Sequence, residues 1–311
     1  MKVLLTTLAL SILSAVAAEQ APKPVADQAQ RRAEHVFIIS YDQGAPVVLE
    51  KADMPLFDEM VKQGAHTWEA YTIVPSITLP SHTSMLTGVG IQKHQILWND
   101  YQPAKGPVQV PTIFKIAKDQ GLKTAMYVGK EKFKQLEIPG SLDVFSLQPG
   151  DMDVARAFAA EVGTLKPNLC FLHFALPDTS GHRFGQFSPE QMKVLAECDV
   201  ALKIIRDAIE AAGLTDSSVI IITADHGGHN VPQKPLPGEV APNPPKMVAT
   251  HGSPNTEDVV IPWIAWGHGV KKDYTITAPV VQYDTAATAL WLLGIPLPEY
   301  FWGRPVVSAF Q

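Results

Sequence analysis

Residues 35–42 read His-Val-Phe-Ile-Ile-Ser-Tyr-Asp, an apolar run that ends in a carboxylate. A run of this kind has no polar face, which is typical of a central parallel strand buried on both sides. The runs at 123–128, 168–176 and 218–223 have the same character. Helical patterns separate them. The alternation therefore predicts an α/β fold, a doubly wound and mostly parallel sheet with helices on both faces.

Start and stop signals mark the helices between these runs. Ser188 and Pro189 mark the beginning of a long helix that ends near Ala212, and Gly213 follows as a stop residue. The other helices predicted in this way lie at 54–64, 80–86, 112–120, 151–165 and 285–293, and further strands at 66–73, 143–146, 259–265 and 274–276. The Pro-rich stretch 231–246 shows neither pattern and is predicted to be a long loop.

The bulk composition is that of a globular protein. The chain has 311 residues, of which 46% are hydrophobic and 18% are charged, enough apolar material for a large core. The sequence shows no internal repeat and no second pattern, so residues 34–311 are predicted to form a single domain. The formal net charge of −6 and the pI of about 5.9 exclude a basic surface for nucleic acid.

The first 18 residues have the features of a secretory signal peptide. Lys2 supplies the positive start, residues 3–13 the apolar run, and Ala15-Val-Ala-Ala18 the small-residue cleavage site. The apolar run is short for a membrane span, although an uncleaved anchor remains an alternative. Residues 19–33 are polar and predicted to be a flexible lead-in. The mature chain is therefore expected to be exported, periplasmic or secreted, and to have no transmembrane span.

Two cysteines, Cys170 and Cys198, occur in the chain. Export would permit a disulfide between them. Cys170 lies in a predicted strand and Cys198 in a predicted helix, so two buried free thiols are favoured over a bonded pair.

A candidate nucleophile lies in the stretch 74–88, Val-Pro-Ser-Ile-Thr-Leu-Pro-Ser-His-Thr-Ser-Met-Leu-Thr-Gly. Thr78 stands between two prolines, just before the helix predicted at 80–86. The start of a helix carries unpaired N–H groups and a positive dipole end, which suits an anion such as phosphate. The alternative is that Thr78 is an ordinary N-cap.

Carboxylates and imidazoles follow the predicted buried strands. The residues are Asp42, Asp178, His182, Asp225, His226 and His251. Each alone could be a turn or surface residue. Together they would converge on the carboxyl edge of a parallel sheet. This donor set suits two transition-metal ions, zinc first and manganese or iron second. Two such ions can activate a hydroxyl and clamp a phosphoryl group.

These motifs together resemble the alkaline phosphatase superfamily, most closely its nucleotide pyrophosphatase/phosphodiesterase branch. The resemblance covers residues 35–251 and extends more loosely to Leu293. The matching motifs are Pro75-x-x-Thr78-x-Pro80-x-His82 with Leu86-Thr87-Gly88, Pro177-Asp178-x-x-Gly181-His182, Asp225-His226-Gly227 and His251-Gly252. The resemblance implies an alkaline phosphatase-like catalytic domain over residues 34–311.

The resemblance also implies a site with two zinc ions. One ion would be held by Asp178, His182 and His251, and the other by Asp42, Asp225, His226 and the Thr78 oxygen. Thr78 would attack phosphorus to form a phospho-threonine that is then hydrolysed. Asn99 would donate a hydrogen bond to a phosphoryl oxygen, although a loop-turn asparagine explains it locally as well.

The expected substrate is a small phosphodiester or nucleotide pyrophosphate. Lys130 and Lys132 keep phosphate monoesters as an alternative, because some monoesterases of the superfamily have a similar basic pair. A solvated charge run also explains the two lysines. Trp98 and Tyr101, with Tyr41 and Phe184, could line a leaving-group pocket, although such aromatic residues usually belong to the core.

The sequence also bears on two other classes of protein, the sulfatases and non-catalytic zinc-binding proteins. The sulfatase motif Cys/Ser-x-Pro-x-Arg is absent at Thr78, which argues against a sulfatase. A more distant alternative is a zinc-binding protein without catalytic activity on the same fold. The sequence leaves the physiological substrate and the oligomeric state open.

Overall fold

The structure, a computed structural model, describes residues 31–235, 237 and 242–311. Within these residues, eight strands form the central sheet in the order β10-β2-β9-β6-β1-β5-β3-β4. Their bounds are β1 His35–Tyr41, β2 Ala65–Tyr71, β3 Thr124–Val128, β4 Val144–Leu147, β5 Leu169–Phe174, β6 Ser218–Ala224, β9 Val260–Gly267 and β10 Tyr274–Thr275. The predicted signal peptide and residues 19–30 of the predicted lead-in lie outside the described residues.

The sheet is mostly parallel, as the sequence predicts. Strand β1 pairs in parallel with β5 and β6, so that Val36 lies beside Leu169 and Val219. Strand β9 is antiparallel to both of its neighbours, β6 and β2. All side chains of β1, β5 and β6 are buried, which explains their lack of a polar face.

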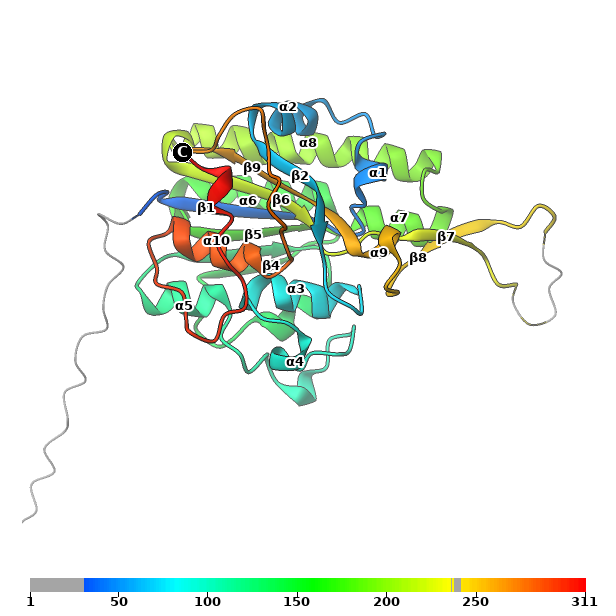
Figure 1. Cartoon of the computed structure of the whole chain (residues 1–311), viewed down its shortest axis with the longest axis horizontal. Helices are drawn as coiled ribbons and strands as arrows, with labels where there is room; N and C mark the ends of the chain where they lie inside the picture. Colours follow the sequence, from blue (N-terminus) through cyan, green and yellow to red (C-terminus); the bar gives the residue numbers. More distant parts are fainter. Residues whose placement is uncertain (1–30, 236, 238–241) are drawn as a thin grey trace, which may run out of the picture.

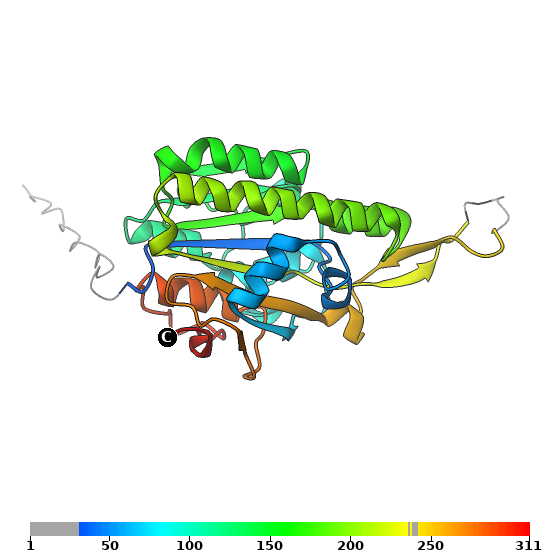
Figure 2. The same cartoon turned by 90° about the horizontal axis from the view of Figure 1, so that it is seen from above.

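Helices cover both faces of the sheet, which confirms the predicted doubly wound α/β fold (Figure 1). Helices α2 (Pro55–Gln63), α6 (Asp151–Leu165) and α8 (Pro189–Ala211) pack on one face. Figure 2 shows α6 and α8 side by side. Helices α3 (Thr78–Thr87), α5 (Ile113–Asp119) and α10 (Asp284–Leu292) pack on the other.

Shorter elements complete the described part of the chain. The short α-helices are α1 Pro46–Leu49, α4 Ile91–His94, α7 Leu176–Phe184 and α9 Thr256–Val259. The 3-10 turns are η2 Pro103–Lys105, η3 Glu131–Leu136, η4 Thr215–Ser217 and η5 Val307–Ala309. None of the helices in the described residues combines the length and the apolar character that a membrane crossing needs.

Three sequence expectations about these elements are wrong in detail. The strand predicted at 168–176 ends at Phe174, because helix α7 begins at Leu176 with Pro177 in its first turn. Helix α3 begins at Thr78 rather than at Pro80. The loop predicted at 231–246 begins two residues later, because β7 (His229–Pro232) includes its first two residues and pairs antiparallel with β8 (Met247–Thr250), which follows the loop. This β7–β8 arm projects from the body of the molecule (Figure 1).

Candidate metal centre and active site

Six predicted ligands lie together in two groups at the carboxyl ends of the strands. Asp42 follows β1 and Asp225 follows β6, and these two strands are neighbours in the sheet. Helix α7 contributes Asp178 and His182 one turn apart, directly after β5. The α7 group is Asp178, His182 and His251, and the β1–β6 group is Asp42, Asp225 and His226. These are the two ligand sets that the family resemblance implies.

The spacing of the donor atoms suits a tetrahedral zinc ion. In the α7 group, Asp178 Oδ1 lies 3.1 Å from His182 Nε2 and 3.4 Å from His251 Nε2. In the β1–β6 group, His226 Nε2 lies 3.6 Å from Asp42 Oδ1 and 3.2 Å from Asp225 Oδ2. Ligands about 2.0–2.1 Å from zinc in a tetrahedron are about 3.3 Å apart. The spacing of the residues present therefore fits the ion.

The three ligand histidines are oriented in the same way. The Nδ1 atoms of His182, His226 and His251 each lie 2.9 Å from a backbone carbonyl oxygen, those of Ala249, Gly227 and Ser76 respectively. A carbonyl only accepts, so each Nδ1 is the protonated nitrogen and each Nε2 presents a lone pair. The tautomer required for metal binding is thus fixed by the path of the backbone.

Several buried atoms in the two groups that could bind a metal ion have no hydrogen-bond partner in the protein. Asp42 Oδ1, Asp178 Oδ1, Asp225 Oδ2 and His226 Nε2 are buried without a hydrogen bond. The Nε2 atoms of His182 and His251 lie 3.1 Å apart, with two lone pairs facing each other. Orphaned buried acceptors of this kind are costly unless a cation lies between them. Both groups therefore have the electrostatics of metal sites.

The protonation of the β1–β6 group follows from burial and charge. Burial and the nearby His251 lower the pKa of His226 to about 3, which keeps its imidazole neutral. Burial and the Asp42 charge raise the pKa of Asp225 well above its usual value. Burial opposes ionisation of Asp42, but Lys130 and His173 outweigh it and lower the pKa of Asp42. Close carboxylates of this kind need cations to share the site.

Thr78 is the first residue of α3 and does not cap the helix. The N-cap position belongs to Ile77, which makes no side-chain capping bond, so the N-cap interpretation of Thr78 is wrong. No hydrogen bond of the Thr78 hydroxyl is seen among the described residues. Asn99 Oδ1 accepts the N–H of Leu79 at 2.9 Å. The amide NH₂ of Asn99 is then the group left to donate at the start of this helix.

Two histidines that are not in the ligand groups form hydrogen bonds with residues of the site. His173 Nε2 lies 2.9 Å from Asp42 Oδ2. His82 Nδ1 donates to the Thr78 carbonyl at 2.8 Å and its Nε2 accepts from Ser40 Oγ at 2.8 Å. Sequence analysis did not assign His173. Its signal is a polar residue within the otherwise apolar strand β5.

Lys130 lies between the two groups. Its Nζ is 2.6 Å from Asp42 Oδ2 and 2.6 Å from Asp178 Oδ2, one carboxylate of each group. These carboxylates more than offset burial and raise the pKa of Lys130. Lys132 has no ion pair among the described residues, and burial together with Lys130 lowers its pKa. Lys130 is thus not part of a solvated charge run.

The aromatic residues suggested for a leaving-group pocket are only partly available. Lys105 Nζ lies 3.6 Å from the Trp98 ring centroid, and Lys134 Nζ lies 5.6 Å from that of Tyr101. Each ring therefore has one face covered by a cation. Tyr41 is buried and packs edge-on against Phe174, so it belongs to the core and not to a pocket.

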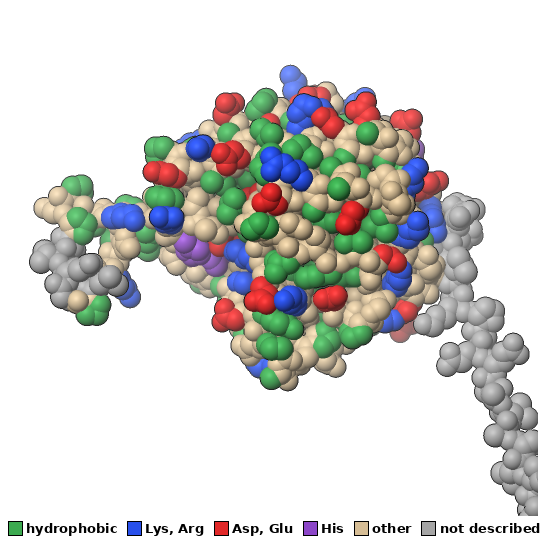
Figure 3. Space-filling view, turned by 180° about the vertical axis from the view of Figure 1, so that it is seen from behind, with side chains coloured by type: hydrophobic (Ala, Val, Ile, Leu, Met, Phe, Trp, Pro, Cys, Tyr) green, Lys and Arg blue, Asp and Glu red, His purple; other side chains and the backbone are tan. Residues whose placement is uncertain are grey.

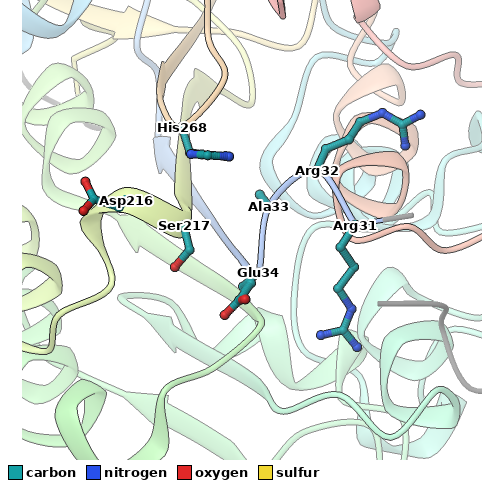
Figure 4. A pocket seen from close by; sticks show the side chains of 7 residues that line it. All are labelled: Arg31, Arg32, Ala33, Glu34, Asp216, Ser217 and His268. Atoms are coloured by element: carbon teal, nitrogen blue, oxygen red, sulfur yellow. The ribbon is translucent and has the colours of Figure 1, made fainter. Parts of the chain in front are cut away.

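Other described features lie away from the two groups. Cys170 and Cys198 are buried and free, as the sequence favours. A hollow of about 390 Å³ lies at the opposite edge of the sheet, where β1 and β6 begin. Figure 4 shows the seven residues that line it. Its lining includes Glu34, Ser217 and His268 but none of the predicted site residues.

A buried carboxylate, Asp151, holds the start of α7. Asp151 accepts the N–H of Ala175 at 2.7 Å and that of Leu176 at 3.2 Å, and Cys198 Sγ lies 3.3 Å from its Oδ2. These bonds lower the pKa of Asp151, but burial outweighs them and raises it to about 6. Asp151 thereby fixes the helix that carries Asp178 and His182.

The raised pKa of Asp151 predicts a pH-dependent stability. A carboxyl with a raised native pKa contributes stability below its unfolded pKa, and this contribution is lost as the pH rises through the native value. Relative to Asp151→Asn, the wild type should lose about 2 kcal/mol between pH 4 and pH 7. Urea unfolding of both proteins with chelator present checks this. Parallel pH curves for the two proteins would contradict it.

The fold and the two groups define the class of protein as alkaline phosphatase-like. The family described as type I phosphodiesterase/nucleotide pyrophosphatase matches residues 36–243. The chain belongs to this family, a branch of the alkaline phosphatase superfamily.

Two proteins that the chain resembles in sequence are ectonucleotide pyrophosphatase/phosphodiesterases. The chain is 26% identical over 251 residues to family member 7 of Mus musculus, covering 72% of this chain and 56% of that protein. It is 25% identical over 196 residues to family member 1 of Homo sapiens, covering 56% of this chain and 21% of that protein. The chain thus spans about half the length, or less, of these relatives.

Solved structures show the same fold. Murine ectonucleotide pyrophosphatase/phosphodiesterase 5, an inactive form in complex with AMP, superposes with a TM-score of 0.71 and 17% identity, covering 89% of this chain and 100% of that one. A 2-O GAG sulfatase gives a TM-score of 0.69 and 14% identity, covering 89% of this chain and 74% of that one. At these identities the likeness concerns the fold alone.

Proposed function

We propose that this chain is an exported, metal-dependent hydrolase that cleaves phosphodiester or nucleotide pyrophosphate bonds through a phospho-threonine. The observation that carries the proposal is the convergence of two ligand groups with orphaned donors. Thr78 lies near them, because its carbonyl and Asp225 Oδ2 are both within 3.5 Å of His82 Nδ1. Family membership and the named relatives support the reaction class. The predicted signal peptide supports export.

The two groups would hold two zinc ions, with manganese or iron as alternatives. Asp178, His182 and His251 would bind one ion, and Asp42, Asp225 and His226 the other. Two such ions, when bound, supply positive charge at the attacking and leaving oxygens and favour the ionised hydroxyl. The His182 side chain is 44% exposed, so the site opens to solvent at the α7 group.

The residues of this chain would have the following roles in the hydrolysis. The Thr78 Oγ attacks phosphorus, its bond to phosphorus forms, and the bond to the leaving oxygen breaks. The Asn99 NH₂ donates to a phosphoryl oxygen and stabilises its developing charge. His82 holds the Thr78 carbonyl, which fixes the nucleophile in position. Water then cleaves the phospho-threonine and restores the hydroxyl.

A second candidate function is phosphate monoester hydrolysis. The observation that favours it is the basic pair, with Lys130 inside the site and Lys132 unpaired beside it. Two divalent ions and two ammonium groups exceed the charge of the three site carboxylates. The surplus matches a dianionic monoester better than a singly charged diester.

Hydrolysis of matched aryl esters separates these functions. Bis(4-nitrophenyl) phosphate and 4-nitrophenyl phosphate release the same product, so their kcat/KM values compare directly. A higher value for the diester supports the proposal, and a higher value for the monoester supports the second candidate. Zinc binding with neither activity would point to a non-catalytic zinc-binding protein and overturn both.

The two lysines should discriminate between substrates. Replacing Lys130 and Lys132 with Ala is expected to lower kcat/KM for the monoester about 10- to 100-fold more than for the diester, because charge-assisted contacts of about 1.5–3 kcal/mol are lost. The control is Lys134→Ala, because Lys134 pairs with Glu131 on the surface. Equal losses for both esters would show that the pair does not recognise the extra charge.

A further inference from the structure

The β7–β8 arm is inserted between two of the ligand histidines. Strand β7 begins at His229, three residues after His226, and β8 ends at Thr250, directly before His251. Figure 3 shows histidine side chains on the surface where the arm meets the body. The position of both ligands therefore depends on how the two ends of this hairpin are held.

A single buried carboxylate, Asp258 in α9, holds both ends. Its Oδ1 accepts from His229 Nδ1 at 2.7 Å. Its Oδ2 accepts from the backbone N–H of Ser253 at 2.9 Å and from Ser253 Oγ at 2.7 Å. Asp258 is fully buried, so these partners replace its hydration. We call this arrangement the Asp258 clasp.

The backbone of α9 continues the clasp to His226. Gly227 donates its N–H to the Asp258 carbonyl at 2.9 Å, and Gly228 donates to the Glu257 carbonyl at 2.8 Å. A Cβ at Gly227 would lie 2.0 Å from the Glu257 oxygen, so only glycine allows this approach. The turn after His226 is therefore packed directly on α9.

The clasp also reaches His251 and the nucleophile segment. Ser76 Oγ donates to the Ser253 carbonyl at 2.8 Å. The Ser76 carbonyl accepts the Nδ1–H of His251 at 2.9 Å. Ser76 lies two residues before Thr78, so the chain of bonds runs from Asp258 to the start of α3.

We propose that Asp258 is a positioning residue that fixes His226 and His251 at the distances both metal ions require. The inference rests on the proposed metal-dependent function. The Asp258 carboxylate contacts His229 at the start of the arm and Ser253 after its end, so one side chain joins the two ends. Without it, the ends of a long hairpin would be closed less tightly and the two imidazoles would sample more positions.

Asp258→Asn tests the proposal because it keeps the size of the side chain and replaces one acceptor with a donor. Zinc affinity is measured by competition with a chromogenic chelator, with folding followed by circular dichroism. We expect zinc binding about 10-fold weaker, the low end for residues that support metal ligands indirectly. Turnover should recover as free zinc is raised, which a purely structural defect would not do.

Asp199→Asn is the matched control. Asp199 is a buried carboxylate that accepts the N–H groups of Leu56 and Phe57 at the start of α2. We expect a loss of stability in this variant with zinc affinity unchanged. If Asp258→Asn does not fold, Ser253→Ala removes one bond of the clasp and should weaken zinc binding in the same direction.

The outcomes separate this inference from the proposed function. Wild-type protein that binds no zinc would overturn the metal-dependent function. If the wild type binds zinc and the folded Asp258→Asn variant binds it with the same affinity, only the role of Asp258 is overturned. Where Asp258→Asn does not fold, an unchanged affinity in Ser253→Ala leads to the same conclusion. Equal weakening in Asp199→Asn would also overturn the role of Asp258, because the effect would then follow stability and not position.

Discussion

Thr78→Ala is expected to bind two zinc ions per chain and to lose nearly all turnover of phosphate esters. The loss should be on the order of 10⁴-fold or more in kcat, because removing a nucleophile abolishes the covalent route. Zinc should remain because the six carboxylate and imidazole ligands are untouched. Steady-state assays on an aryl diester, with elemental analysis of the same sample, check both parts.

Two variants make this result specific. Thr78→Ser keeps a hydroxyl at the start of α3 and should retain turnover within about 10- to 100-fold of the wild type. Thr83→Ala removes a buried hydroxyl one turn further along, which donates to the Leu79 carbonyl, and should leave turnover nearly unchanged. A Thr78→Ala protein with wild-type turnover would exclude Thr78 as the nucleophile.

Removal of the metal ions is expected to abolish turnover and to lower the free energy of unfolding. Chelation leaves Asp42, Asp178 and Asp225 close together with Lys130 as the counter-charge. Each ion present at about 1,000 times its Kd contributes about 4 kcal/mol to the folded state. Thermal unfolding and turnover should both return when zinc is added back, with two zinc ions bound per chain.

Zinc retention should also depend on pH in a defined direction. Protonated His182 would donate a hydrogen bond to Asp178, 3.1 Å away, and this outweighs burial and raises the pKa of His182. Protons therefore compete with zinc at this nitrogen at a higher pH than for a free imidazole, and zinc is lost as the pH falls through that range. Full activity after exhaustive chelation would contradict the two-metal site.

The buried strands could be predicted from sequence because a strand buried on both faces consists mostly of apolar residues. Strands β1 and β6 are mostly apolar and buried along their whole length, and each is followed by a carboxylate, Asp42 and Asp225. Since parallel strands end at one edge, their convergence follows from topology alone. The i, i+4 pair Asp178 and His182 lies on one face of α7 for a similarly local reason.

The remaining features depend on contacts between distant segments. The sequences of β7 and β8 show no alternation of apolar and polar residues, and Pro232 in β7 argues against a strand. Asp258 is one of two acidic residues in the short helix α9, and its contacts with His229 and Ser253 are visible only in three dimensions. The bridging position of Lys130 likewise needs β3 and β1 to lie on either side of β5, the strand that leads into α7.

The orientation of the ligand imidazoles has a consequence for how this site tolerates mutation. All three Nδ1–H groups donate to backbone carbonyls, those of Ser76, Gly227 and Ala249. A change of side chain at Ala249 leaves its carbonyl in place, whereas Ser76 also holds Ser253 through its hydroxyl. At Gly227 the lack of a side chain is itself required by packing. The acceptors that orient the three imidazoles are thus backbone atoms, which a substitution moves only by displacing the backbone.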